Sequence, residues 1–117
     1  MRIFISQPMA GRTNEEIESE RNRIVEAAMQ QYGYDVKVID SFMQRIPADA
    51  KPLWLLGESI KLLSFADVAI FAPYWHDYRG CKIECKACME YGITAVEYIE
   101  DPLYVDRFMP IKDCYFC

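Results

Sequence analysis

Val68-Ala69-Ile70-Phe71-Ala72 is the stretch of sequence that decides the fold, because it is apolar at every position. A strand of this kind suits burial on both of its faces, as happens to a central strand of a parallel sheet. On either side of it, strand-like segments alternate with helix-like segments, and this alternation indicates βαβ units. The sequence therefore predicts an α/β protein built on a parallel sheet.

The neighbouring elements follow from hydrophobic spacing and from residues typical of helix ends. Apolar and β-branched runs predict strands at 2–6, 35–39 and 94–99. Apolar stripes predict helices at about 14–32, 53–65 and 80–91, and a capping box from Thr13 to Glu16 opens the first of them. The tail after residue 99 is expected to add a fifth strand or a short helix.

Length and composition bound the kind of protein. A chain of 117 residues is expected to form one domain, 1–117, and its 52% apolar and 26% charged residues are a globular balance. The net charge of −5 argues against broad binding to nucleic acid or to anionic membranes. No apolar run approaches the roughly 20 residues that span a bilayer, and the apolar start is too short for a signal peptide. We therefore expect a cytoplasmic protein with mostly reduced cysteines.

Open parallel sheets bind ligands beyond the carboxyl ends of their strands. Glu84 is the most informative residue there, because it lies on the apolar stripe near the start of the third helix. That stripe is expected to contain Gly80, Ile83, Glu84, Ala87, Cys88 and Tyr91. A carboxylate so placed can attack an anomeric carbon and stabilise an oxocarbenium-like transition state. The alternative is a structural carboxylate at the edge of the stripe, paired with Arg79 or a backbone amide.

The loop from Ser6 to Arg12 joins the first strand to the first helix. Backbone amides at the helix start, together with Arg12, can hold a phosphate or a carboxylate. The alternative is that Arg12 is a solvated surface charge.

The loop from Trp75 to Arg79 is dense in polar and aromatic residues. Trp75 or Tyr78 can stack on a base, and Asp77 or His76 can move a proton. The alternative places Trp75 in packing over the end of the sheet and His76 in solvent.

Five cysteines form two groups, one on the third helix and one at the carboxyl terminus. Cys81, Cys85 and Cys88 have helical spacing, and Cys114 and Cys117 form a C-x-x-C pair. A metal or redox site is one interpretation if the tail folds back onto the helix. Small packed thiols are the other.

The pattern Ile3-Phe4-Ile5-Ser6-Gln7-Pro8-Met9, with Ala66-Asp67-Val68 and Trp75-x-x-x-Arg79-Gly80-x-x-x-Glu84, resembles the nucleoside 2-deoxyribosyltransferase-like superfamily. The resemblance is nearest to a branch of small bacterial and phage proteins and covers most of residues 1–99. It implies a flavodoxin-like three-layer fold with a four- or five-stranded parallel sheet. It also implies that Glu84 is the nucleophile, and that a homo-oligomer, a dimer or larger, forms, in which a neighbouring subunit completes each site.

The resemblance places further residues around the substrate. The loop after the first strand would contact the sugar or its 5′ group through Ser6, Gln7, Met9, Gly11 and Arg12. Ser59 stands where active members carry an aspartate on the second helix, with Glu58 beside it. Tyr78 stands where they often carry an acid, and Asp77 lies one residue away. Ile3 and Phe4 stand where many members have a tyrosine.

The leading functional prediction is cleavage or transfer at the N-glycosidic bond of a nucleoside or nucleotide, by a glycosidase or transferase. Glu84 would react, and Asp77 or Glu58 would assist proton transfer. The substrate would meet Ser59, Trp75, Tyr78, Arg79 and Gly80 as well as the first loop. No cofactor or metal is expected. A nucleotide-binding module without chemistry and a cysteine-based metal or redox protein are the two alternatives.

Overall fold

The computed structural model describes residues 1–40, 47–103 and 106–113. Its elements in chain order are β1 (Arg2–Ser6), α1 (Asn14–Tyr32), β2 (Lys37–Val38), α2 (Pro52–Leu63), β3 (Val68–Phe71), the short 3₁₀ helix η1 (Trp75–Asp77), α3 (Arg79–Tyr91), β4 (Thr94–Ile99) and β5 (Arg107–Pro110). The predicted strands and helices are all present, within a few residues of their expected ends. The second strand is shorter than predicted, because the chain is still turning at Tyr34 and Asp35.

The sheet has the strand order β2-β1-β3-β4-β5, which is the order of flavodoxin-like folds. β1 pairs in parallel with β2 on one side and with β3 on the other, and β3 pairs in parallel with β4. The predicted four- or five-stranded parallel sheet is confirmed with four parallel strands, and β5 adds a fifth strand antiparallel to β4 at this edge. A short loop joins β4 to β5, and a connection of that length makes a hairpin rather than a crossover.

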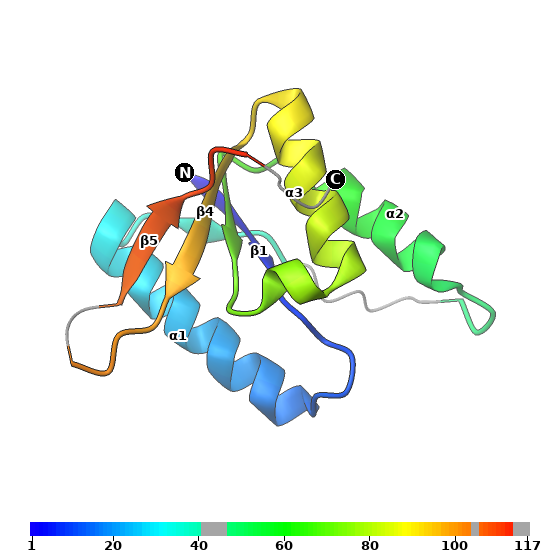
Figure 1. Cartoon of the computed structure of the whole chain (residues 1–117), viewed down its shortest axis with the longest axis horizontal. Helices are drawn as coiled ribbons and strands as arrows, with labels where there is room; N and C mark the ends of the chain where they lie inside the picture. Colours follow the sequence, from blue (N-terminus) through cyan, green and yellow to red (C-terminus); the bar gives the residue numbers. More distant parts are fainter. Residues whose placement is uncertain (41–46, 104–105, 114–117) are drawn as a thin grey trace.

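Alternate residues of the strands face two separate apolar cores, one on each side of the sheet. On one side, Ile3 and Ile5 of β1 pack against α1 through Ile24 and Ala28. On the other side, Phe4 of β1 belongs to a core that α2 and α3 cover. The result is a three-layer α/β/α arrangement, visible in Figure 1 as α1 on one side of the sheet and α2 and α3 on the other.

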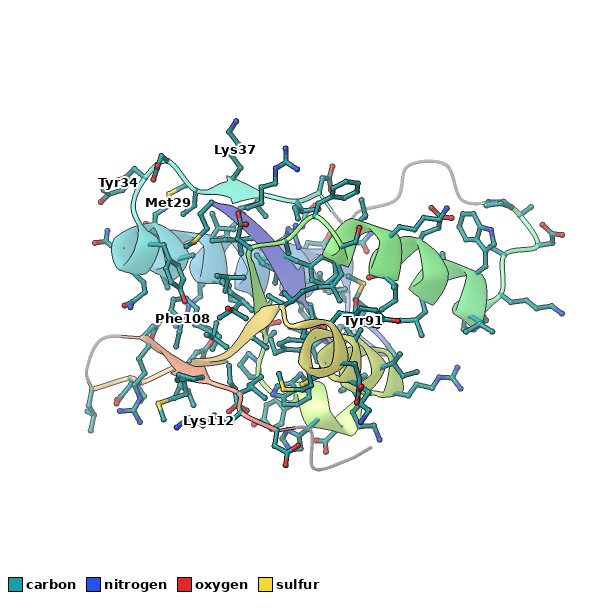
Figure 2. All side chains as sticks on the ribbon, turned by 90° about the horizontal axis from the view of Figure 1, so that it is seen from above. Met29, Tyr34, Lys37, Tyr91, Phe108 and Lys112 are labelled. Atoms are coloured by element: carbon teal, nitrogen blue, oxygen red, sulfur yellow. The ribbon has the colours of Figure 1, made fainter. Side chains whose placement is uncertain are left out.

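β5 completes the core on the α1 side. Phe108 lies between Tyr98 of β4 and Tyr32 of α1, with ring centroids 5.7 and 5.8 Å apart. Figure 2 shows Phe108 on the inner side of the β5 ribbon, whereas Lys112 lies beyond the strand. The antiparallel strand therefore covers apolar surface at the end of α1.

The buried face of α3 differs from the predicted one. Its buried residues are Cys81, Glu84, Cys85 and Cys88, whereas Ile83 is 46% exposed and Tyr91 is 84% exposed. The helix is rotated about its axis so that the small cysteines pack on the sheet, which leaves the bulkier side chains outside. Glu84 belongs to the buried stripe in either orientation. On α2, Leu53 is likewise exposed and not packed on the sheet, because the first turn of this helix extends past the sheet.

The amino end of α1 has the predicted cap. The Glu16 amide donates to Thr13 Oγ1 at 3.2 Å, and Glu15 and Glu16 place negative charge in the first turn. Thr13→Ala is expected to lower the free energy of unfolding by about 1 kcal/mol, because one amide at the helix start loses its acceptor. Urea denaturation measures this change, and an unchanged midpoint with an unchanged slope would contradict it.

The arrangement of the strands positions the candidate site. β2 lies on one side of β1 and β3 lies on the other, so the connections from these strands run in opposite directions. A crevice therefore forms beyond the carboxyl ends of β1 and β3. In Figure 1 these two ends, η1 and the first turn of α3 gather at the lower edge of the sheet. Within the described part of the chain, no helix combines the length and the apolar character needed to cross a membrane.

Candidate functional site

Glu84 is a buried carboxylate held by two hydroxyl groups from two other elements. Ser6 Oγ, at the end of β1, donates to Glu84 Oε1 at 2.9 Å, and Ser59 Oγ, on α2, donates to Glu84 Oε2 at 2.6 Å. Glu84 is only 6% exposed. A carboxylate so buried is kept in proteins when it is paired or used. No cation is paired with it in the described structure, so Ser6 and Ser59 supply its hydrogen bonds.

Burial raises the pKa of Glu84 above its ordinary value. The hydrogen bonds from Ser59 and Ser6 act in the opposite direction, because they favour the charged form. Burial is the larger influence. The carboxyl group is therefore easier to protonate than an exposed glutamate, a property common among reacting carboxylates.

A cleft of about 760 Å³ opens beside Glu84, and its lining is mostly apolar. The lining residues belong to β1 and the loop after it, to α2 from its N-cap Lys51 to Ser59, and to the first turns of α3. Those from the loop and helices include Met9, Lys51, Leu53, Leu56, Ser59, Arg79, Gly80 and Ile83. The volume lies within the range of small-molecule sites, and one carboxylate in an apolar cleft has the character of a ligand site.

The structure brings seven of the predicted site residues to this cleft. They are Ser6, Gln7, Met9, Ser59, Arg79, Gly80 and Glu84. Ser59 was expected only as a substrate contact, and the structure gives it a bond to the carboxylate as well.

Gln7 has an unusual hydrogen-bonding state. Its Nε2 donates to the Ile17 carbonyl oxygen at 3.0 Å and to Glu20 Oε1 at 3.1 Å. Because both partners are acceptors, the orientation of the amide is fixed. Gln7 Oε1 is buried and is without a partner among the described residues. Buried acceptors without partners are rare in folded proteins and require an explanation.

Arg12 lies away from the cleft. Its Nη1 donates to the Pro8 carbonyl oxygen at 2.8 Å and to Glu20 Oε1 at 3.0 Å. These bonds hold the loop after β1 in shape, and Gly11 allows its turn with a φ of 78°. Arg12 is thus neither a cleft residue nor a solvated charge, because it pairs with Glu20.

Trp75, in the loop before α3, also lies away from the cleft of Glu84. Trp75 is buried over the end of the sheet, where its Nε1 donates to Glu97 Oε1 at 3.0 Å and its ring packs 5.1 Å from that of Phe71. Tyr74, with a φ of 66°, makes the turn that directs Trp75 to this side. The structure thus corrects the prediction that Trp75 reaches the ligand with Glu84 and agrees with the packing alternative.

Asp77 and Tyr78 border a second, smaller hollow with Arg12 and Glu20, on the other side of the loop after β1. Neither residue lines the cleft of Glu84. Glu58 faces away as well, because it pairs with Lys61 at 2.9 Å. The expectation that one of these acids stands beside Glu84 is therefore not met in the described structure.

The cysteines of α3 are packed thiols. Burial raises the pKa of Cys81 and of Cys85 to about 11 and that of Cys88 to about 12, so all three stay protonated at neutral pH. The described residues contain no group of three or more side chains suited to a metal ion. Cys114 and Cys117 lie outside the described residues.

The hydrogen bond from Ser59 allows a direct test of the electrostatics of Glu84. Ser59→Ala removes a donor to the ionised carboxylate, so the pKa of Glu84 is expected to rise further. The acidic limb of any Glu84-dependent pH profile should move to higher pH. Ser64→Ala is the matched control, because Ser64 is the C-cap of the same helix and its hydroxyl donates to the Lys61 carbonyl oxygen, not to Glu84. Equal shifts in both variants would contradict the assignment.

The sequence alone did not single out Lys51 or the apolar wall of α2 as cleft residues. Lys51-Pro52 before an apolar run is a helix-start signal, and it carries no mark of a ligand site. Only the position of α2 beside α3 brings these residues to Glu84. No family model, no curated protein and no solved structure matches this chain.

Proposed function

We propose that this chain cleaves or transfers the N-glycosidic bond of a nucleoside or nucleotide, with Glu84 as the nucleophile. The observation that supports this most is the Glu84 carboxylate itself, buried at the wall of an apolar cleft and oriented by Ser6 and Ser59. A nucleophile must be held in one orientation before the substrate arrives, because misplacement costs rate steeply.

The proposed reaction has two steps. A Glu84 carboxylate oxygen attacks C1′ of the sugar while the bond from C1′ to the base nitrogen breaks. The electron pair of that bond leaves with the base, which takes a proton from water. Water, or the nitrogen of a second base, then attacks C1′ and loses its proton to the hydroxide left by the first step. The bond from C1′ to the Glu84 oxygen breaks, which restores the Glu84 carboxylate.

The apolar walls suit the two groups that flank the reacting bond. Leu53, Leu56 and Ile83 offer surface for the flat face of a base, and the buried carboxylate stabilises the positive charge that develops on the sugar. Because Trp75 is turned away, recognition of the base is proposed to rest on aliphatic contacts.

A binding module without chemistry is the second candidate. The observation that favours it is that Glu84 is the one carboxylate lining the cleft within the described residues, while Asp77 and Glu58 lie elsewhere. Without a neighbouring acid, departure of the base depends on solvent for its proton. Thermal stabilisation by a nucleotide without any product would support this function.

We also propose that the protein acts in the cytoplasm as a homo-oligomer. Leu53 and Trp54 in the first turn of α2 are exposed apolar side chains, and exposed apolar surface of this kind supports association. Sedimentation or light scattering gives the oligomeric state directly.

Base release from a panel tests the proposed chemistry. Common ribonucleosides, 2′-deoxynucleosides and their 5′-monophosphates are incubated with the protein, with and without a second free base, and the products are separated by HPLC. Acid quenching and mass analysis should then find the glycosyl group on the peptide that contains Glu84. Failure of every substrate, or an adduct on a different residue, would remove the proposal.

A further inference from the structure

The loop between β1 and α1, residues 7–12, forms part of the wall of the cleft, because Met9 lines it. The end of β1 itself is held by the sheet, since the Ala72 amide donates to the Ser6 carbonyl oxygen at 2.9 Å. Residues 7–12 belong to no strand. The position of this part of the wall therefore depends on contacts other than strand pairing.

Glu20 of α1 binds both ends of this loop through a single oxygen atom. Gln7 Nε2, at the start of the loop, donates to Glu20 Oε1 at 3.1 Å, and Arg12 Nη1, at its end, donates to the same oxygen at 3.0 Å. The side chain of Glu20 is 16% exposed, so solvent screens these bonds only in part. One residue outside the loop thus connects its first residue to its last.

Each of the two donors has a second acceptor. Gln7 Nε2 also donates to the Ile17 carbonyl oxygen at 3.0 Å, and Arg12 Nη1 also donates to the Pro8 carbonyl oxygen at 2.8 Å. Ile17 and Glu20 are three residues apart on α1, so they lie on the same side of the helix. Because α1 is packed in the core on its side of the sheet, it gives the loop a rigid support.

Met9 lies in the chain between the two residues that Glu20 binds. It is 42% exposed and lines the cleft. A loop whose ends are released has more conformations, and a ligand must then order the loop when it binds. Loss of Glu20 would therefore weaken binding in the cleft, although Glu20 does not contact Glu84 in the described structure.

We infer that Glu20 is a positioning residue of the candidate site, which fixes the loop of residues 7–12 through Gln7 and Arg12 and so holds Met9 in the wall of the cleft. The affected step is substrate binding, so the inference rests on the proposed function. Glu20 is not among the described residues that line the cleft, and it acts on the substrate through the loop.

Steady-state kinetics test this role with the substrate of the panel that releases its base fastest. Glu20→Ala should raise KM about ten-fold and change kcat less than three-fold, because Ser6 and Ser59 still orient Glu84. Glu20→Gln should raise KM less than three-fold, since the carbonyl oxygen of glutamine can accept both of the bonds that Glu20 Oε1 accepts. Glu18→Ala is the matched control, because Glu18 is an exposed acid on the same helix, and its KM should change less than two-fold.

A double variant tests whether the effect passes through the loop. Arg12→Ala removes one of the two bonds to Glu20 and should raise KM by itself. Glu20→Ala and Arg12→Ala together should raise KM no further than Glu20→Ala does alone, because both changes release the same contact. Multiplied effects of the two substitutions would contradict a shared path.

NMR of methionine methyl groups tests the position of Met9 without any substrate. In protein labelled with ¹³C at these methyl groups, the Met9 signal is identified by its loss in Met9→Leu. The signal should move in Glu20→Ala and keep its place in Glu18→Ala. If Glu20→Ala does not fold, Arg12→Ala serves for both the NMR and the kinetic measurements.

The outcomes separate this inference from the proposed chemistry. An unmoved Met9 signal, or equal rises in KM for Glu20→Ala and Glu18→Ala, would overturn the inference. A lower Tm for Glu20→Ala with unchanged KM would also overturn it, because the role of Glu20 would then be structural alone. A moved Met9 signal in a protein that releases no base from any substrate would uphold the role of Glu20 in the cleft wall while the proposed chemistry fails.

Discussion

Glu84→Gln is expected to lower base release by a factor on the order of 10⁴, because loss of a reacting group typically costs several powers of ten in rate. Glutamine keeps the size of the side chain and can still hydrogen-bond to Ser6 and Ser59. It cannot form the ester with C1′. Measured rates of base release by the two proteins, at saturating substrate, give the factor. A loss of less than ten-fold would contradict a covalent role for Glu84.

The same substitution is expected to stabilise the folded protein at neutral pH. Because burial raises the pKa of Glu84, the folded state binds the proton more tightly than the unfolded chain does. The wild type is therefore relatively more stable at low pH and loses this contribution as the pH rises through the raised pKa. Glutamine has no charge to bury, so the variant should unfold a few degrees higher at pH 7, a gain on the order of 1 kcal/mol.

Thermal unfolding followed from pH 4 to pH 8 checks the sign. The difference in Tm between Glu84→Gln and the wild type should shrink as the pH falls, because protonation removes the charge in the wild type. A lower Tm for the variant at pH 7 would show that the carboxylate stabilises the fold. Glu90→Gln, on the exposed side of α3, is a suitable control.

Trp75→Ala is expected to lower the free energy of unfolding by about 3–5 kcal/mol, the usual range for removing a buried tryptophan. The side chain belongs to the core on the α2 and α3 side of the sheet, and its Nε1 is bonded to Glu97. For a protein of this size the loss corresponds to a fall in Tm on the order of 10–20 °C. This prediction treats Trp75 as a structural residue.

Trp75→Phe keeps the assignment testable if the alanine variant does not fold. It retains a ring against Phe71 and removes the bond to Glu97, so a loss of about 1 kcal/mol is expected. Affinity for nucleotides should not change, because Trp75 does not line the cleft of Glu84. A selective loss of nucleotide binding with unchanged stability would restore the stacking role that the sequence suggested.

Much of the fold could be predicted from local patterns. The unbroken apolar run at Val68–Phe71 specified a central strand, and Thr13 with Glu16 located the start of α1. Glu84 could be recognised because a carboxylate on an apolar stripe is costly to bury wherever the helix lies. These features depend on residues close together in the sequence, so they can be predicted without the tertiary structure.

The orientation of α3 could not be predicted in the same way. The sequence of α3 contains two possible inward-facing rows of residues, both with helical spacing and offset by one position. One row contains Ile83 and Tyr91, and the other contains Cys81 and Cys85. Hydrophobicity favoured the larger side chains. In the structure the small thiols pack in one core with Phe71, and this packing is known only once the sheet is in place.

The sequence also could not give the direction of β5 or decide between the two positions considered for Trp75. Arg107–Pro110 has a poor strand pattern, and its pairing depends on the hairpin with β4. The turn at Tyr74 separates Trp75 from the residues of the cleft, and a left-handed tyrosine has no sequence signal comparable to glycine.

The hydrogen bond between Ser59 and Glu84 links α2 to α3 at the point where a sugar would react. An ester at Glu84 carries no negative charge, so its oxygens accept hydrogen bonds more weakly than the carboxylate does. Under the proposed mechanism, the hydrogen bond that holds α2 to α3 would therefore weaken while a glycosyl group is attached and would be restored when that group leaves. The strength of this contact between α2 and α3 would then change once in every turnover.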